Sequence, residues 1–301
     1  MSIWDALIQG IVQGLTEFLP VSSSGHLSLV QYFTGNSGET GAFFSILLHL
    51  GTLIAVFIAF RKTIWELIVE AFSMLTDIFR GKFSFKSMNG KRRMIWMFVL
   101  SEIPLLFFLL VKDYISMVSA DNSILIEGFC FTITGVLLLL ADKLGSGKTN
   151  MDNMRPKDAL AMGFAQSIAT LPGISRSGST VAAGLLMGLD RGYAVTFSFI
   201  MGVPAVLGAN LLELVDVVRE PFPVGMDVAL VGVAAAVIFG LLAIKMVQWL
   251  IHTDKYKWFG YYTLALGAVV ILIGLIECST GHVIQRRLDP CTGKTPWRRA
   301  W

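Results

Sequence analysis

The chain has 301 residues, of which 54% are hydrophobic and 15% charged, with a formal net charge of +3 and a mean hydropathy of +0.68. The charged share is well below that of ordinary globular domains, so the chain is short of polar surface for a soluble fold. The composition therefore excludes a soluble enzyme and predicts an all-α integral membrane protein.

The first element in the chain is a broken helical region over about residues 3–34. Two short apolar helices are separated there by Pro20 and a run of small residues, and neither helix is long enough to span a membrane. We expect a re-entrant helical hairpin, because irregular backbone at membrane depth must be buried in protein or line a wet cavity. Its turn carries the sequence EFLPVSSSGH, from Glu17 to His26.

Six apolar runs are long enough to cross a hydrocarbon core of roughly 30 Å. They lie near residues 42–60, 94–111, 123–141, 193–215, 228–251 and 258–277. Between the first two runs, residues 64–79 have apolar side chains at helical spacing interrupted by acidic ones, which predicts an amphipathic helix along the cytoplasmic interface. We expect residues 1–281 to form a single polytopic membrane domain, and the polar, basic residues 282–301 to be a disordered tail.

The distribution of Lys and Arg predicts the orientation in the membrane. The loops after the first, third and fifth runs are rich in basic residues: Arg61, Lys62, Arg80, Lys82, Lys86, Lys91, Arg92, Arg93, Lys143, Lys148, Arg155, Lys157, Lys255 and Lys257. The loops after the second and fourth runs hold little beyond Lys112 and Arg219. The positive-inside rule puts the rich loops in the cytoplasm and both termini outside, although the basic tail disagrees. A disulfide between Cys278 and Cys291, near the outer end, is geometrically conceivable.

The chain contains an internal repeat. The sequence DALIQGIVQGL from Asp5 recurs as DALAMGFAQSI from Asp158, 153 positions later, and the same register places Ser24-Gly25 on Ser177-Gly178. The halves, about 3–141 and 156–277, each hold one hairpin motif and three runs, so an odd number of crossings inverts the second copy. The second motif, about 158–189, is broken at Pro172, and we expect the two hairpin tips to meet near the membrane midplane.

The polar residues of the first tip indicate a function. Gln13 and Glu17 share one helical face, and a carboxylate at membrane depth is costly enough to suggest a functional site. Glu17 could pair structurally with Arg176 across the repeat axis. Alternatively, Glu17 and Gln13 could hold a hard divalent cation, which favours a carboxylate together with phosphate oxygens.

Both tips carry groups that suit a phosphate. Ser22 or Ser23 can cap the following helix, whose free backbone N–H groups form an anion site, and His26 lies one turn beyond Ser23. The second tip, PGISRSGST, supplies Arg176, whose planar guanidinium matches phosphate oxygens. Together the tips predict a site for a phosphate with a metal ion attached.

The stretches QGLTEFLPVSSSGH and LPGISRSGST closely resemble the two signature regions of the undecaprenyl-diphosphate phosphatases, membrane enzymes of the bacitracin-resistance type. The resemblance runs from about residue 3 to 277. It implies hydrolysis of undecaprenyl diphosphate to the monophosphate, which recycles the lipid carrier for peptidoglycan synthesis and confers bacitracin resistance. It also implies a bacterial cytoplasmic membrane location, a site that faces the outer side, and a divalent cation, Mg²⁺ or Ca²⁺.

Carried onto this chain, the resemblance implies that Glu17 and Gln13 hold the metal and that Arg176 binds the diphosphate. Ser23 would attack phosphorus with His26 as its base, or His26 would itself be the nucleophile. The remaining residues of the phosphate pocket would be Ser22, Ser24, Gly25, Ser175, Ser177, Gly178 and Thr180. Gln13 stands where other members carry Glu, which leaves the metal site one carboxylate poorer.

A rival interpretation is a carrier that flips a lipid phosphate, because inverted repeats with hairpins that meet at the midplane are typical of transporters. Fold alone does not decide between the two. The spacing of Ser23 and His26 favours the enzyme, since a carrier has no use for a nucleophile. We expect membrane lipids to surround the protein and no nucleic-acid partner. The sequence does not decide whether the protein forms a homodimer.

Overall fold

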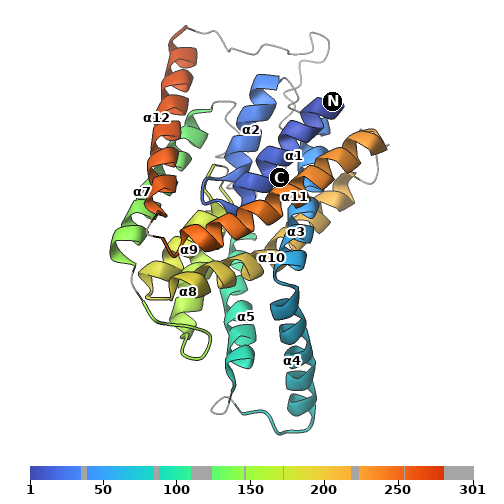
Figure 1. Cartoon of the computed structure of the whole chain (residues 1–301), viewed down its shortest axis with the longest axis vertical. Helices are drawn as coiled ribbons and strands as arrows, with labels where there is room; N and C mark the ends of the chain where they lie inside the picture. Colours follow the sequence, from blue (N-terminus) through green and yellow to red (C-terminus); the bar gives the residue numbers. More distant parts are fainter. Residues whose placement is uncertain are drawn as a thin grey trace.

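The computed structural model in Figure 1 is all-helical and describes residues 1–34, 39–84, 88–109, 124–145, 147–171, 173–217, 224–253 and 255–280. Within these residues, eleven helices follow one another: α1 Ile3–Phe18, α2 Ser23–Thr34, α3 Glu39–Ala59, α4 Arg61–Phe79, α5 Gly90–Leu109, α7 Leu125–Leu144, α8 Pro156–Ile168, α9 Arg176–Leu186, α10 Arg191–Val217, α11 Met226–Leu250 and α12 Lys257–Thr280. The predicted all-α class is confirmed.

All six predicted runs coincide with helices, but they differ in how well they suit a membrane. In the described parts of the chain, four helices, α7, α10, α11 and α12, are long and apolar enough to cross. The pair of α3 and α4, bent by 81°, would be a fifth candidate if the two helices formed one broken span. Helix α5 is not among them, since it begins at Gly90, takes in Lys91, Arg92 and Arg93, and carries Glu102. The protein is a multi-pass membrane protein with four or five clear candidate spans.

Helix α4 is the predicted amphipathic helix. It exposes large apolar side chains such as Trp65, Phe72 and Phe79, while Leu67 and Met74 are buried. Figure 1 shows α4 and α5 running together at one end of the molecule, and they are in contact. Arg92 of α5 joins the two helices, with Nε 2.6 Å from an oxygen of Glu70 and Nη2 2.7 Å from an oxygen of Asp77.

The two repeat motifs fold into matching helix pairs, α1–α2 and α8–α9. Asp5 closes the start of α1 through a capping box with Ser2, and its repeat counterpart Asp158 accepts the backbone N–H of Arg155 at the start of α8. Ser175 accepts the N–H of Gly178 at the start of α9, and its counterpart Ser22 accepts that of Gly25 ahead of α2. The sequence repeat is therefore also a repeat of local structure.

Each first helix of a pair packs along a long helix from the other half. Helix α1 lies along α11, and α8 lies along α5. Glycines allow both close approaches, since a Cβ at Gly10 would lie 2.4 Å from the carbonyl oxygen of Gly232, and one at its counterpart Gly163 would lie 2.2 Å from that of Ser101. The two halves thus interlock rather than fold separately.

The turns of the two pairs touch each other. Ser177 Oγ donates a hydrogen bond of 3.2 Å to the carbonyl oxygen of Leu19, and the N–H of Gly173 donates one of 3.4 Å to Ser24 Oγ. The expected meeting of the tips is confirmed as a contact between them. The break at Pro172, the tail after residue 281 and the proposed Cys278–Cys291 disulfide lie outside the described residues.

Candidate active site

Glu17 is the centre of the polar cluster where the two turns meet. Its side chain is 6% exposed, and each carboxylate oxygen accepts hydrogen bonds. Oε1 accepts from Nη2 of Arg176 at 2.5 Å, and Oε2 accepts from Ser23 Oγ at 2.6 Å and from Gln13 Nε2 at 2.9 Å. The structural pairing of Glu17 with Arg176 across the repeat is therefore present, together with the expected proximity of Gln13.

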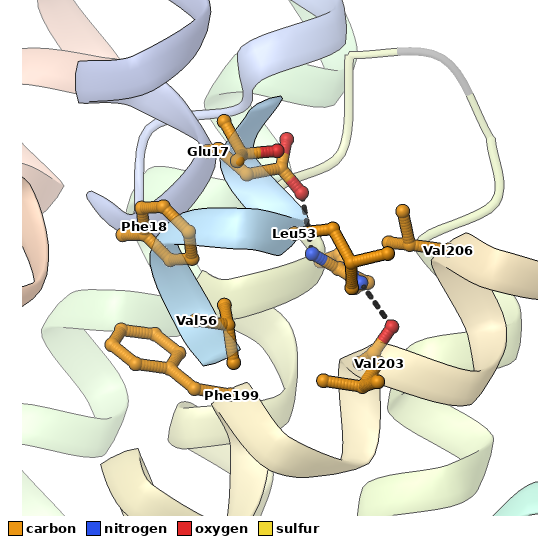
Figure 2. Close-up of a pocket in the computed structure, with 10 residues that line it drawn as sticks. Glu17, Phe18, Leu53, Val56, Phe199, Val203 and Val206 are labelled. Carbon is orange, nitrogen blue, oxygen red and sulfur yellow. Dashed lines mark hydrogen bonds and ion pairs between the residues drawn. The ribbon is translucent and has the colours of Figure 1, made fainter. Parts of the chain in front are cut away.

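Arg176 begins α9 and divides its guanidinium between two acceptors. Nη2 contacts Glu17, and Nη1 donates a 3.1 Å hydrogen bond to the carbonyl oxygen of Gly202 in α10. Figure 2 shows Glu17 facing a pocket whose other labelled residues are apolar, among them Leu53, Val56 and Val203. The cavity is only about 10 Å³, which is room for about one water and not for a phosphate. A phosphate that bound Nη2 of Arg176 would displace the contact of that nitrogen with Glu17.

Gln13 and Glu17 fit a hard cation in one respect. Gln13 Oε1 is buried and has no hydrogen-bond partner, although the same amide contacts Glu17. An unpaired amide oxygen beside a carboxylate suits Mg²⁺ or Ca²⁺, which bind oxygen ligands and complete their shells with water and phosphate. Among the described residues, no three His, Cys, Asp or Glu side chains come together in a cluster, so the protein would supply few of the ligands.

The hydrogen bonds of Ser23 and His26 go to other partners in this structure, so the expected nucleophile–base pair stays a prediction. The Ser23 hydroxyl is hydrogen-bonded to Glu17, as described above. The imidazole turns back by one helical turn, so that Nδ1 lies 2.7 Å from the carbonyl oxygen of Ser22, and Nε2 lies 2.8 Å from the hydroxyl of Tyr262. In this structure Glu17, rather than His26, is the group placed to accept the proton of Ser23.

The other serines and glycines of the tips surround this cluster. Ser22 holds φ at 71°, in the left-handed region, and caps α2; the sequence had left open whether Ser22 or Ser23 did so. Ser175 takes the same role for α9 and lies 3.4 Å from Ser177, oxygen to oxygen. The N–H groups of Gly25 and Gly178 donate to these capping hydroxyls, at 3.3 and 3.0 Å.

Thr180 lies apart from these groups. Its hydroxyl donates to the carbonyl oxygen of Arg176, 2.8 Å away, and contacts Ser198 Oγ of α10 at 2.6 Å. The side chain therefore joins α9 to α10 and does not reach the Glu17 cluster. Although Thr180 belongs to the PGISRSGST motif, it does not lie in the expected phosphate pocket in this structure.

Sequence reasoning missed three polar groups near the site. His49 of α3 has Nε2 3.7 Å from Glu17 Oε2, and it could have been suspected as one of only four histidines, placed inside an apolar run. Gln9 is fully buried one turn before Gln13 and accepts from Gln31 at 3.1 Å. Gln166, the repeat counterpart of Gln13, donates to Glu102 of α5 at 3.2 Å. The offset of 153 between the repeats relates Gln166 to Gln13, and this is the signal that could have identified Gln166.

Comparison with known proteins agrees with the residues of both motifs. The family model described as bacitracin resistance protein BacA matches residues 6–269. A protein of Alkaliphilus metalliredigens named undecaprenyl-diphosphatase is 39% identical over 280 residues, which cover 92% of this chain and 100% of that protein. Proteins of the same name from Methanosphaera stadtmanae and Corynebacterium glutamicum are 37% and 36% identical, and cover 92% and 89% of this chain and 99% and 89% of their own lengths.

The matched region takes in both helix pairs from residue 6 on, the Glu17 cluster and about the first half of α12. With more than two thirds of each chain aligned above 30% identity, the likeness concerns the whole fold and not a shared motif. This chain belongs to the bacitracin resistance protein BacA family.

Proposed function

We propose that this protein hydrolyses undecaprenyl diphosphate to undecaprenyl phosphate and inorganic phosphate. The observation that carries the proposal is the cluster of Glu17, Ser23 and Arg176 at the meeting of the two turns, in a chain whose relatives are named undecaprenyl-diphosphatase. The product would return to peptidoglycan synthesis as the lipid carrier. Removal of the diphosphate form would confer resistance to bacitracin.

The contacts suggest a division of labour in the reaction. Ser23 Oγ would attack the terminal phosphorus while its proton passes to Glu17, which already accepts it in a hydrogen bond of 2.6 Å. Arg176 would leave Glu17 for the phosphate oxygens, where its planar fork stabilises the charge in transit. The leaving group is undecaprenyl phosphate, and water would then release inorganic phosphate from Ser23.

His26 would act from its position in the first turn of α2. Because the Ser23 hydroxyl is hydrogen-bonded to Glu17 and not to His26, we favour for His26 a role in proton transfer to or from the phosphate groups. Gln13 and Glu17 would hold a divalent cation, Mg²⁺ or Ca²⁺, which supplies positive charge against the phosphate oxygens. The N–H groups at the starts of α2 and α9 would bind the remaining phosphate oxygens.

The proposed setting is a bacterial cytoplasmic membrane. We propose six crossings with the two helix pairs as re-entrant hairpins of opposite orientation, both termini outside and the site open to the outer side. The repeat of caps and of glycine contacts supports this inverted arrangement. Hydrolysis on the outer side would meet the lipid where cell-wall polymerisation releases it.

The test is phosphate release from undecaprenyl diphosphate by the purified protein in detergent, with and without a chelator. We expect metal-dependent release by the native chain, and losses of a hundredfold or more for Glu17→Gln, Ser23→Ala and Arg176→Ala. Glu66→Gln is the control, because Glu66 is half-exposed on α4 and pairs only with Lys91 at the surface. A native protein that binds the lipid but releases no phosphate would support the carrier instead.

A further inference from the structure

The imidazole of His26 has a defined tautomer in this structure. Nδ1 lies 2.7 Å from the carbonyl oxygen of Ser22, and a carbonyl oxygen can only accept, so Nδ1 carries the hydrogen. In a neutral ring, Nε2 is then the basic nitrogen. It lies 2.8 Å from the hydroxyl of Tyr262, which must be the donor in that contact.

Tyr262 reaches this position from α12, 236 residues away in the chain. Its ring is stacked on the imidazole, with centroids 5.8 Å apart and planes 17° from parallel, and Phe131 of α7 meets the imidazole edge-on at 5.3 Å. The orientation of His26 is thus set by one contact from its own helix and by two aromatic residues of the packed α7–α12 pair.

A phenol suits a partner that changes its protonation state. With neutral His26 the Tyr262 O–H donates to Nε2, and with a protonated imidazole the Nε2–H donates to the phenol oxygen. The phenol keeps its own hydrogen in both cases. Tyr262 can therefore be the partner of Nε2 both before and after a proton transfer at that nitrogen, whereas a pure acceptor or a pure donor could be the partner in only one of the two states.

We propose that Tyr262 is a positioning residue, which holds the His26 imidazole at the start of α2 through both protonation states during phosphate hydrolysis. The inference rests on the proposed phosphatase activity and on the role of His26 in it. Tyr262 acts only through His26. Removal of its hydroxyl should matter only while His26 is present.

A double-mutant cycle tests this dependence. We expect Tyr262→Phe to lower kcat about tenfold, the loss of one hydrogen bond to a group that becomes charged, with KM for the lipid changed less than about twofold. Tyr262→Phe combined with His26→Gln should be no slower than His26→Gln alone. Tyr261→Phe is the matched control, because Tyr261 packs against Trp258 and not against His26. Losses that multiply in the double variant would overturn the proposal.

A second measurement does not depend on activity. Diethyl pyrocarbonate modifies unprotonated imidazole nitrogen, and its rate at His26 can be read by peptide mass spectrometry against the exposed His252 as internal reference. Tyr262→Phe should raise the rate at His26 about fivefold or more, since Nε2 loses its partner. Equal rates in both chains would overturn the inference, whereas a native chain that releases no phosphate would overturn the proposed function.

Discussion

The buried carboxylate of Glu17 accepts hydrogen bonds from three side chains. Two of these donors, Ser23 and Arg176, are groups that phosphate chemistry would need. A carboxylate in an apolar site is costly unless its hydrogen-bonding capacity is filled, and Arg176, Ser23 and Gln13 fill it here. Under the proposed function, a bound phosphate would compete with Glu17 for Arg176 and Ser23.

Arg176→Lys keeps the positive charge but removes the planar guanidinium, so it tests which of the two the site requires. The guanidinium reaches Glu17 with one nitrogen and the Gly202 carbonyl with another, and a lysine ammonium cannot reproduce this planar fork. We expect kcat/KM for undecaprenyl diphosphate to fall by roughly 10- to 150-fold, which corresponds to one lost charge-assisted hydrogen bond. Arg61→Lys, at the exposed start of α4, should leave the rate unchanged. A fully active Lys variant would show that only the charge of Arg176 matters.

The residues of the Glu17 cluster and the contact of Glu17 with Arg176 were predictable, but the partners of Ser23 and His26 were not. Glu17, Ser23 and Arg176 stand out because polar groups in apolar sequence are rare, and the repeat relates the two tips. Spacing suggested that Ser23 would contact His26, yet the Ser22 carbonyl, which accepts the backbone N–H of His26, also takes Nδ1 of the imidazole. Tyr262 and His49 could not be placed, since only packing of distant helices brings them to the site.

At the scale of the helices, contacts between backbones decide how the halves fit. Gly163 lets α8 approach α5 so closely that an added Cβ would lie 2.2 Å from the Ser101 carbonyl oxygen. Backbone cannot yield as the end of a flexible side chain can. The helices must separate to admit even one methyl group.

We therefore expect Gly163→Ala to lower stability by roughly 1–3 kcal/mol, the usual cost of overpacking. The measurement is the midpoint of thermal unfolding in detergent. Gly208→Ala in α10 is the matched control, because a Cβ at Gly208 would meet nothing within 4 Å, and alanine there should be neutral or slightly stabilising. Equal midpoints for the two variants would contradict a tight α5–α8 contact.

Arg92 is expected to anchor α4 to α5. It pairs with both Glu70 and Asp77, and its side chain is 18% exposed. Arg92→Met should speed amide hydrogen exchange in α4 several-fold, since the bend of 81° after α3 leaves α4 few other anchors. Lys91→Met removes the neighbouring pair with Glu66, which is about half-exposed, and should change the exchange little. Similar effects of both variants would point to general charge loss.

The sequence predicted the limits of the helices more closely than it predicted which helices suit a membrane. The apolar periodicity of 64–79 predicted a helix, and α4 extends it by only three residues at its start. The run at 94–111 is likewise helical, but α5 begins four residues earlier and brings basic residues into the helix. Charge at the ends of a run does not stop a helix, although it changes how well that helix suits a hydrocarbon core.

For the molecule as a whole, the number of crossings depends on α5. With α5 as a span, the start of α7 lies on the side opposite to Lys82, whereas without it both lie on the same side. The inverted repeat requires the first arrangement, because each half must cross an odd number of times. Helix α8 packs along α5 as α1 packs along α11. This similarity supports the assignment of α5, like α11, as a membrane span.

Single cysteines decide both the crossing number and the orientation. In a chain whose three native cysteines are replaced by serine, Asn122→Cys should react with a membrane-impermeant maleimide in intact cells. Lys82→Cys and Lys148→Cys, in two of the three basic loops, should react only after permeabilisation, because positive loops stay in the cytoplasm. Equal reactivity at residues 82 and 122 would remove α5 from the spans and with it the inverted repeat. The reverse pattern at all three positions would turn the Glu17 site towards the cytoplasm, where it could not meet the lipid diphosphate released on the outer side.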